Sequence, residues 1–296
     1  MRTHKLFHGA WIAIMTIGMA GCEPEELAVA VPVVKTPADL PSAPATPPPT
    51  GTPGSTPTSE IPRTSVPGRL SMIKWAPLDY KSFEYNAEGR LVTYTTQYNS
   101  VQGTDIVTKD VYTYHYNSQG QVTSVVTREG FKTEYSYAGE VWKEALSFDK
   151  LNRPLKKYLF TFNSQKQLTR YKSFRIDLQG KESPESIVDL TYENGNLTRW
   201  NESYYNAETG NFVLSTQLAL SNFDNKKHAH NANSFGYILQ PLTFWKNNPG
   251  KKEFIGNASP IESYSYVYDA DGYPVKKRTT YTYDKPLPAM ECEFVY

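Results

Sequence analysis

The sequence predicts an all-β protein, an antiparallel meander of hairpins that forms a strongly curved sheet or a partly closed barrel after a disordered N-terminal linker. The 296 residues include 40 aromatic residues, and 38 of them fall within residues 69–296. In runs such as TYTTQY and YSYVY these aromatics recur at every second position, which is the period of a β-strand. Turn-forming residues follow each aromatic run at a nearly constant distance from it. No window of the sequence has a comparably strong helical period.

Residues 1–21 have the features of a secretory signal peptide. A basic start with Arg2 and Lys5 precedes the apolar run AWIAIMTIGMA, which is too short to span about 30 Å of hydrocarbon as a helix. Met19-Ala-Gly-Cys22 resembles the lipobox of bacterial lipoproteins, with Met19 in place of the usual Leu. The resemblance implies cleavage before Cys22 and lipid, such as palmitate, on its thiol. The alternative is an ordinary signal peptide followed by an incidental cysteine.

Residues 22–68 have the composition of a disordered linker. They contain 12 of the 21 prolines and no aromatic residue. A segment of Pro, Thr, Ser and Ala cannot bury enough apolar surface to offset its ordering entropy, and proline favours extended chain. We therefore expect a tether between a lipid at Cys22 and a folded domain at residues 69–296.

One strand–turn–strand unit recurs through the folded domain. The copies are Phe83–Leu91, Tyr114–Val122, Phe160–Leu168, Leu190–Leu197, Tyr204–Phe212 and Tyr266–Val275, with degenerate copies around Tyr137, Phe148 and Phe223. Asn or Asp opens each turn by bonding its own backbone, and Gly supplies the positive φ that closes it. The third copy has Lys166 in the glycine position. The unequal spacing of the copies favours a meander of about fourteen strands over a solenoid of fixed period.

The interval from Asn225 to Glu262 contains no clear copy. We expect a strand near Phe235–Leu239, a loop around Asn247–Lys252 and room for a short helical turn. A transmembrane barrel is the alternative architecture for the whole domain. Charged residues on both faces of strands, as in Lys156-Lys157 and Lys276-Lys277-Arg278, argue against it, because charge on a lipid face costs about 2–4 kcal/mol per residue at the midplane.

The copies Phe83–Tyr94 and Tyr266–Lys277 resemble the tyrosine–aspartate (YD) repeats of Rhs-type proteins, which form β-sheet shells. The layout of lipobox, polar linker and hairpin domain, with an Asp-x-x-Gly-Tyr-Pro turn inside Tyr264–Tyr283, resembles a family of uncharacterised Gram-negative lipoproteins. That family is described as porin-like in fold and has no established activity. The resemblance implies a fold and a location in the cell envelope rather than a chemistry.

Motifs for common enzymes are absent, so we expect no catalytic residues, no cofactor and no metal. His228 and His230 could share a strand face and hold a metal, but no third ligand is fixed by spacing, and the flanking residues favour a solvated loop. Asp269 and Asp271 are similar to the start of a calcium loop whose later ligands are missing. Cys292 lies on the apolar face of the last strand and is expected to pack there as a small hydrophobe.

Two rows of tyrosines are the candidate ligand-binding residues. Tyr112, Tyr114 and Tyr116 share one strand face, and Tyr264, Tyr266 and Tyr268 share another. On an exposed concave sheet such rows could stack on sugar rings. In the alternative interpretation the rows are core residues or cross-strand pairs.

These features predict an exported lipoprotein with a non-enzymatic binding role, for a glycan or a peptide. One alternative is a structural or protein-interaction component of an envelope complex; another is a hydrolase with unrecognised carboxylates. The expected partners are a membrane, through lipid on Cys22, and a glycan or an envelope protein. A net charge of +1 argues against nucleic acid. We expect the outer membrane as the location, with the periplasmic and surface faces both open.

Overall fold

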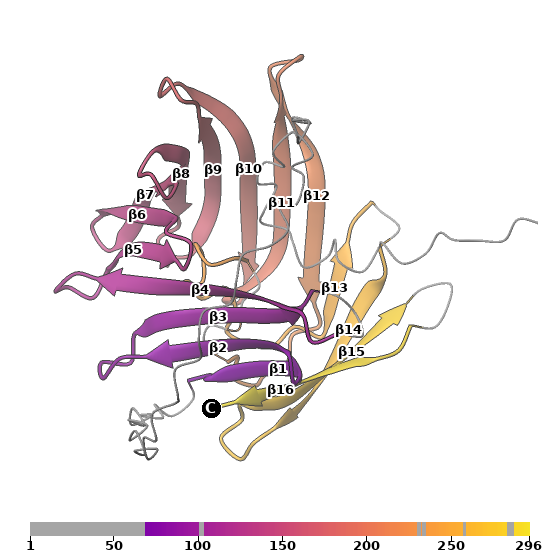
Figure 1. Cartoon of the computed structure of the whole chain (residues 1–296). Coiled ribbons are helices and arrows are strands. Elements are labelled where there is room, and N and C mark those ends of the chain that lie inside the picture. Colours follow the sequence, from indigo (N-terminus) through magenta and orange to yellow (C-terminus); the bar gives the residue numbers. More distant parts are fainter. Residues whose placement is uncertain (1–68, 101–103, 230–231, 233–234, 257–258, 283–286) are drawn as a thin grey trace, which may run out of the picture. The chain divides into compact units, whose positions relative to one another are not determined.

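The computed structural model describes residues 69–296 except 101–103, 230–231, 233–234, 257–258 and 283–286 (Figure 1). The described chain is built from strands joined by turns and loops. The strands are β1 (Met72–Ala76), β2 (Asp79–Tyr85), β3 (Leu91–Asn99), β4 (Val107–Tyr116), β5 (Val122–Thr127), β6 (Lys132–Ala138), β7 (Val141–Phe148), β8 (Pro154–Phe162), β9 (Leu168–Ile176), β10 (Glu182–Glu193), β11 (Asn196–Asn206), β12 (Asn211–Ser221), β13 (Lys251–Phe254), β14 (Ile261–Tyr268), β15 (Pro274–Thr282) and β16 (Met290–Val295).

The sixteen strands form a closed antiparallel barrel in which each strand pairs with its neighbours in sequence. The first and last strands complete the circle, with Met72 opposite Val295 and Ile73 opposite Phe294. The all-β prediction is confirmed, and the sheet closes fully rather than partly. Closure leaves no unpaired edge, which removes the main aggregation risk of a long sheet.

Five copies of the repeated unit form hairpins at one end of the barrel, and the copy Tyr204–Phe212 forms the β11–β12 hairpin at the other end. In the first copy, the Asn86 side chain accepts a hydrogen bond from the backbone N–H of Arg90 at 2.8 Å, and Gly89 has a φ of 72°. In most copies the register shifts by one residue just before the second aromatic, as between Glu84 and Tyr85 and between His115 and Tyr116. Such a bulge increases the local twist and re-aims the side chain that follows it.

The second aromatic of a copy ties neighbouring hairpins together. Each of three tyrosine hydroxyls donates to a backbone carbonyl at or just before the start of an earlier strand. The bonds are Tyr85 to Leu70 at 2.8 Å, Tyr116 to Leu91 at 2.7 Å and Tyr137 to Val122 at 3.0 Å. Tyr296 makes the same kind of bond to Pro274 at 3.0 Å. The recurrence of tyrosine in the sequence therefore has a structural cause at these positions.

The connection between β12 and β13, residues 222–250, enters the barrel and is called the inner segment below. Leu239 and Phe244 are buried within it. The expected strand at Phe235–Leu239 is wrong, because these residues form a bend and turns that pack on the barrel wall. The loop expected around Asn247–Lys252 is confirmed as far as Gly250. Strand β13 begins at the next residue, Lys251.

Residues 1–68, which include the predicted signal peptide and the linker with Cys22, lie outside the described residues. Within the described part of the chain, no helix is long and apolar enough to cross a membrane.

Candidate functional site in the barrel interior

The first predicted tyrosine row faces the inside of the barrel. Tyr112 and Tyr114 are only 5% and 3% exposed. The Tyr112 ring stacks on Tyr237 of the inner segment with centroids 4.4 Å apart, and the Tyr114 hydroxyl donates to the Tyr237 carbonyl at 2.8 Å. Tyr116 is half-buried and bonds to the backbone of β3. This row is therefore covered by the chain itself and does not line an open groove.

The second row also faces inward, and its hydroxyls are bound to other groups of the protein. Tyr264 donates to the Glu262 carboxylate at 2.6 Å, and Tyr266 donates to the Pro249 carbonyl of the inner segment at 3.0 Å. Tyr268 contacts the Asp224 carboxylate, again in the inner segment. Burial is the main cause that raises the pKa of all three phenols. Ligand binding by either row stays a prediction, since both rows already have partners within the chain.

Aromatic stacking also holds the inner segment against the opposite wall. Phe235 stacks on Trp200 of β11 with centroids 4.3 Å apart. The Tyr135 hydroxyl donates to the Ile238 carbonyl at 2.9 Å, and the Leu197 amide donates to the Phe244 carbonyl at 2.8 Å. The inner segment thus contacts β4, β6, β11 and β14. It fills the part of the interior that lies next to these contacts, called the filled part below.

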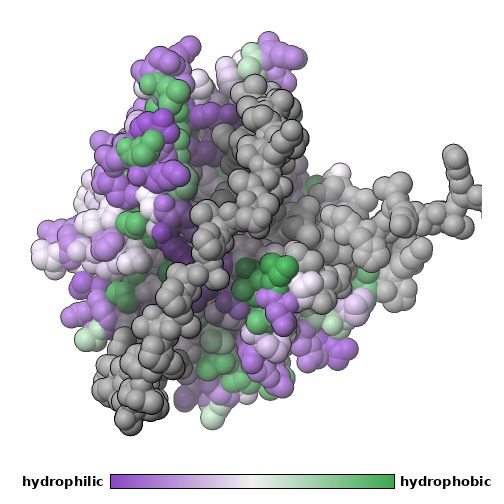
Figure 2. Space-filling model, viewed as in Figure 1, coloured by the Kyte–Doolittle hydropathy of each residue, from purple (hydrophilic) through white to green (hydrophobic). Residues whose placement is uncertain are grey.

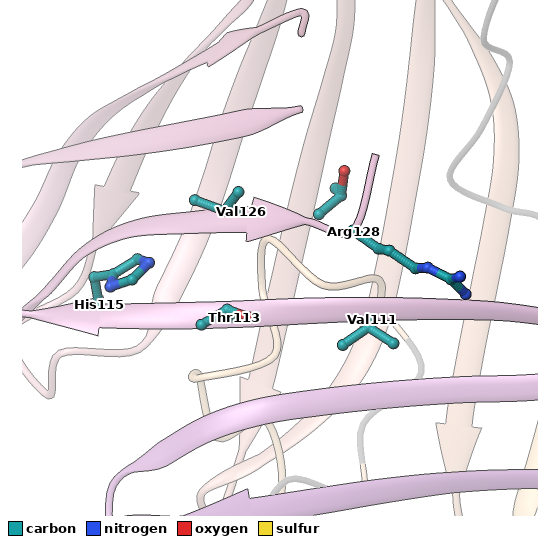
Figure 3. Close-up of a pocket in the computed structure, with 6 residues that line it drawn as sticks. Val111, Thr113, His115, Val126 and Arg128 are labelled. Atoms are coloured by element: carbon teal, nitrogen blue, oxygen red, sulfur yellow. The ribbon is translucent and has the colours of Figure 1, made fainter. Parts of the chain in front are cut away.

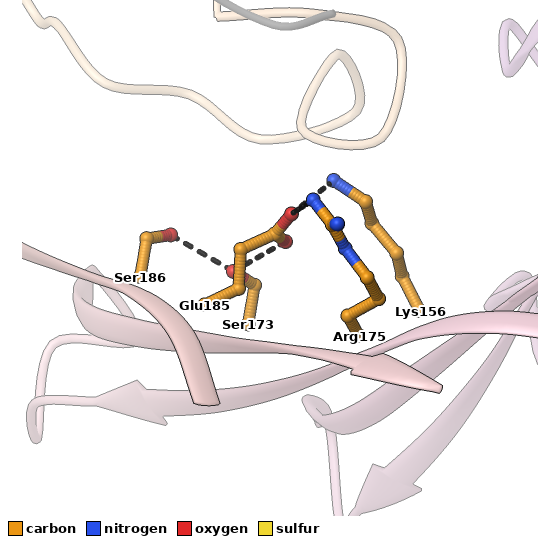
Figure 4. Close-up of polar contacts among 5 residues, drawn as sticks. All are labelled: Lys156, Ser173, Arg175, Glu185 and Ser186. Atoms are coloured by element: carbon orange, nitrogen blue, oxygen red, sulfur yellow. Dashed lines mark hydrogen bonds and ion pairs between the residues drawn. The ribbon is translucent and has the colours of Figure 1, made fainter. Parts of the chain in front are cut away.

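A cluster of polar side chains faces the interior from β8, β9 and β10 and is called the polar cluster below. Its members are Lys156, Ser173, Arg175, Glu185 and Ser186 (Figure 4). Lys156 Nζ lies 2.9 Å from Glu185 Oε1, and Arg175 Nη2 lies 3.4 Å from the same oxygen. Ser173 donates to Glu185 Oε2 at 3.1 Å and lies 2.8 Å from the Ser186 hydroxyl. Both carboxylate oxygens of Glu185 therefore have partners.

Two carboxyl groups in this region have opposite pKa shifts. Burial raises the pKa of Glu185, but the hydrogen bond and charge of Lys156, together with Ser173 and Arg175, more than offset this and hold it below its ordinary value. Burial raises the pKa of Glu202 on β11, the charge of Glu185 raises it further, and a hydrogen bond with Tyr204 opposes the shift. An ionised carboxylate thus lies near a carboxyl group that holds its proton more readily.

Solvent reaches the interior near the polar cluster. Tyr204 pairs with Ser186 and with Val213, so all three residues share the inward face. Even so, Tyr204 and Val213 are 43% and 53% exposed, and the Arg175 side chain is 62% exposed. This part of the interior is therefore open, in contrast to the part that the inner segment fills.

The outer face of the barrel is polar. Arg170 and Asp189 lie on the outward face of their strands, and Arg170 Nε is 2.5 Å from Asp189 Oδ1. A second outward ion pair joins Lys157 Nζ and Glu182 Oε1 at 2.9 Å. The visible surface is mainly hydrophilic, with hydrophobic residues in small separate patches (Figure 2). A shallow depression on this face is lined by Val111, Thr113, His115, Val126, Thr127 and Arg128 (Figure 3). It has one histidine and one arginine and no cluster that suggests a reaction.

The remaining sequence candidates have structural partners. Asp269 Oδ1 accepts hydrogen bonds from the backbone amides of Asp271 and Tyr273, so its carboxylate stabilises the turn. The His228 ring packs beside Trp245, whereas His230 lies outside the described residues. Among the described residues, no three His, Cys, Asp or Glu side chains are grouped so that they could hold a metal. Cys292 is buried on the inward face, as predicted.

Comparison with solved structures supports the fold. A porin-like protein from Bacteroides uniformis aligns with 76% of this chain and 96% of its own, at 12% identity and a TM-score of 0.55. A porin-like protein from Bacteroides vulgatus aligns with 77% and 98%, at 13% identity and a TM-score of 0.37. No protein-family model and no curated protein matches the sequence. The likeness to the Bacteroides uniformis structure supports a porin-like β-barrel fold for this chain, and its kinship with lipoproteins and YD repeats stays a prediction.

The sequence did not predict the polar cluster. Lys156 and Glu185 are 29 positions apart and belong to strands that are not adjacent. Glu185 lies at a bulge, where the register of β10 against β9 shifts between Pro184 and Ser186. Proline beside a run of polar residues in a strand was the available signal, because proline in a sheet marks an edge or a bulge.

Proposed function

We propose that this protein is a non-enzymatic binding protein of the cell envelope, which takes a polar ligand such as a glycan or peptide into the open part of its barrel. The observation that supports this most directly is the polar cluster on an inward face that solvent reaches. Lys156 and Arg175 are donors, Glu185 is an acceptor, and Tyr204 adds an aromatic face beside them. Ligand sites commonly combine a few convergent polar groups with aromatic side chains.

Attachment to a membrane through lipid on Cys22 is the second part of the proposal. It rests on the lipobox-like sequence and on the Pro-rich stretch after it. The outward ion pairs of β8–β10 support a barrel that is tethered beside a membrane, because charged side chains on a lipid-facing wall are costly. Cys22→Ser should move the protein from the membrane to the soluble fraction, and persistent membrane association would contradict the tether.

The binding proposal is tested by screening the full chain carrying Cys22→Ser against glycan and peptide arrays. A hit should weaken at least tenfold in Arg175→Ala and Tyr204→Ala, which alter the open part. It should be unchanged in Arg170→Ala, the matched change of an outward arginine on β9. Arrays without a reproducible hit, or a hit insensitive to both inward changes, would exclude the open part as the binding site.

The opposite pKa shifts of Glu185 and Glu202 favour one alternative, a hydrolase that uses the two carboxyl groups. In such an enzyme Glu202 would donate a proton and Glu185 would act as base or nucleophile. The ion pair of Glu185 with Lys156 argues for a binding role, because it lowers the basicity of the carboxylate. Release of reducing sugar from any array hit, abolished by Glu202→Gln, would establish the enzyme instead.

A further inference from the structure

Two lysines face the barrel interior from β2 and β15, away from the polar cluster. Lys81 pairs with Ile73 on one side and Thr96 on the other, and Lys277 pairs with Tyr266 and Cys292. Ile73 and Cys292 are buried, which fixes the inward direction of this face. Only β16 and β1 separate the two lysine-bearing strands in the wall. Both lysine side chains are half-buried, so solvent can reach them.

Neither ammonium group has an anionic partner within the described part of the chain. The carboxylate of this region, Glu262, is held by Lys252 Nζ at 2.7 Å and by the Tyr264 hydroxyl at 2.6 Å. Lys277 Nζ lies over the Tyr264 ring, 4.8 Å from its centroid, and makes no ion pair. Lys81 makes neither an ion pair nor a ring contact in the described chain.

This arrangement leaves an excess of positive charge in this part of the barrel interior. The nearby groups carry three lysine charges, on Lys81, Lys252 and Lys277, against the carboxylates of Glu262 and of Asp110, which lies two strands from Lys81 in the same inward row. Burial, together with the charge of Lys277, lowers the pKa of Lys81 to about 8; burial is also the main cause that lowers the pKa of Lys277. An ammonium group that loses part of its water without gaining an anionic partner is destabilised, so a bound anion would stabilise the protein.

We propose that Lys81 and Lys277 form an oxyanion-binding site inside the barrel. Each ammonium offers three N–H donors, which suits a phosphate, a sulfate or the carboxylate of an acidic sugar. Tyr264 supports the site by donating a hydrogen bond to Glu262, which already pairs with Lys252, and by placing its ring under Lys277. The site is separate from the polar cluster and does not rest on the proposed function.

The proposal has a defined pH dependence. The titratable groups that face the two lysines are Asp110, Lys252, Glu262, Tyr264, Tyr266, Tyr281 and Cys292. Burial raises the pKa of the three tyrosines and of Cys292, so these groups stay neutral near pH 7. Anion binding should therefore be strong below pH 8 and weaken above it, as Lys81 loses its proton.

The test is thermal unfolding of the purified full chain in phosphate, sulfate or glucuronate, against chloride at equal ionic strength. At tenfold excess over Kd, a bound oxyanion should raise the Tm by about 3–6 °C. A response to phosphate and sulfate alone identifies an inorganic anion as ligand, and a response that includes glucuronate identifies a carboxylate ligand. No difference from chloride would overturn the proposal.

Substitutions locate the response. Lys81→Met and Lys277→Met should abolish the anion-dependent rise in Tm and should raise the Tm in chloride, because each removes an unpaired charge. Lys276→Met is the matched control, since Lys276 lies on the outer face of the same strand near Glu293. A rise that survives in both inward variants would overturn the site. Lys81→Gln and Lys277→Gln give the same readout if methionine prevents folding.

Discussion

The interior of the barrel has a filled part and an open part, and inward side chains have different roles in the two. In the filled part, aromatic rings from β4 and β11 stack on the inner segment, and tyrosine hydroxyls bond to its carbonyls. In the open part, lysine, arginine and glutamate side chains face solvent from the inward surface of β8–β10. The difference shows that alternation along a strand determines which residues face inward, whereas the inner segment determines which of them are core.

The largest effect is expected for an aromatic ring in the filled part. Trp200→Ala removes a buried ring that stacks on Phe235, and large-to-small changes of this kind cost about 3–5 kcal/mol. Tyr98→Ala is the comparison outside the filled part, because Tyr98 of β3 also faces inward but is 42% exposed; it should cost less than about 1 kcal/mol. Urea denaturation measures both values, and equal losses would mean that the two positions do not differ in packing.

Hydroxyl deletions test whether the inner segment is held by the wall. Tyr135→Phe removes the side-chain donor to the Ile238 carbonyl, and Tyr114→Phe leaves the Tyr237 carbonyl with only the 3.3 Å bond from the Gln240 amide; we expect each to cost about 1–3 kcal/mol. In the double variant, backbone amides of residues 235–242 should exchange with deuterium faster than those of β4 and β6. Tyr80→Phe, which removes a hydroxyl bonded to Gln97 in the wall, should leave that exchange unchanged. Uniform acceleration across the barrel would show that the inner segment does not open separately.

In the open part the matched pair is Glu185→Gln and Asp189→Asn, which change an inward and an outward carboxylate of β10. We expect Glu185→Gln to cost about 1–2 kcal/mol at pH 7, because it breaks charge-assisted hydrogen bonds in a half-buried setting. Asp189→Asn should cost less than about 1 kcal/mol, since its ion pair with Arg170 is exposed.

The pH dependence of this pair follows from the sign of the shift. The pKa of Glu185 is lowered in the folded state, so its ionised form stabilises the protein above its ordinary pKa of 4.5. That contribution is lost as the pH falls through the lowered value. The stability difference between wild type and Glu185→Gln should therefore shrink in acid. A difference that is independent of pH between 7 and 3 would mean that charge is not its origin.

The sequence was sufficient to predict the hairpins because their determinants are local. The turn-forming roles of Asn86 and Gly89 follow from their residue types and spacing alone, and the alternating aromatics indicate the strand period. The inner segment was not predictable in this way. Phe235–Leu239 has the composition of a strand, but its partners Trp200 and Tyr112 come from β11 and β4. Those contacts exist only once the barrel has closed, and no local pattern encodes them.

The same reasoning applies to the charged residues of the interior. Alternation predicted that lysines would occur on both faces of their strands, and Lys156 and Lys157 do face opposite ways. It did not predict that Lys156 would meet Glu185, because this contact crosses β9 and depends on a bulge in β10. Charge partners across non-adjacent strands are a property of register and curvature, which are set by the whole sheet.

The smallest effect is expected in a hairpin turn. The third copy of the repeated unit has Lys166 where most other copies have glycine. Lys166 has a φ of 59°, in the left-handed region that costs a non-glycine residue about 1–2 kcal/mol. Glycine would remove this strain but would lose more entropy on folding, which offsets about 0.5–1 kcal/mol of the gain. Lys166→Gly should therefore raise the free energy of unfolding by up to about 1 kcal/mol, as measured in urea.

Two controls separate strain from other contributions to this turn. Lys166→Ala removes the exposed contact with Glu140 but keeps a Cβ in the left-handed region, so it should not stabilise the protein. Gly120→Ala makes the reverse change in the second copy, where a Cβ would lie 2.8 Å from the Arg90 guanidinium, and should destabilise it. If Lys166→Gly and Lys166→Ala have equal stability, backbone strain does not distinguish the copies. The lysine would then be a neutral substitution in a turn that Asn163 and its hydrogen bonds already determine.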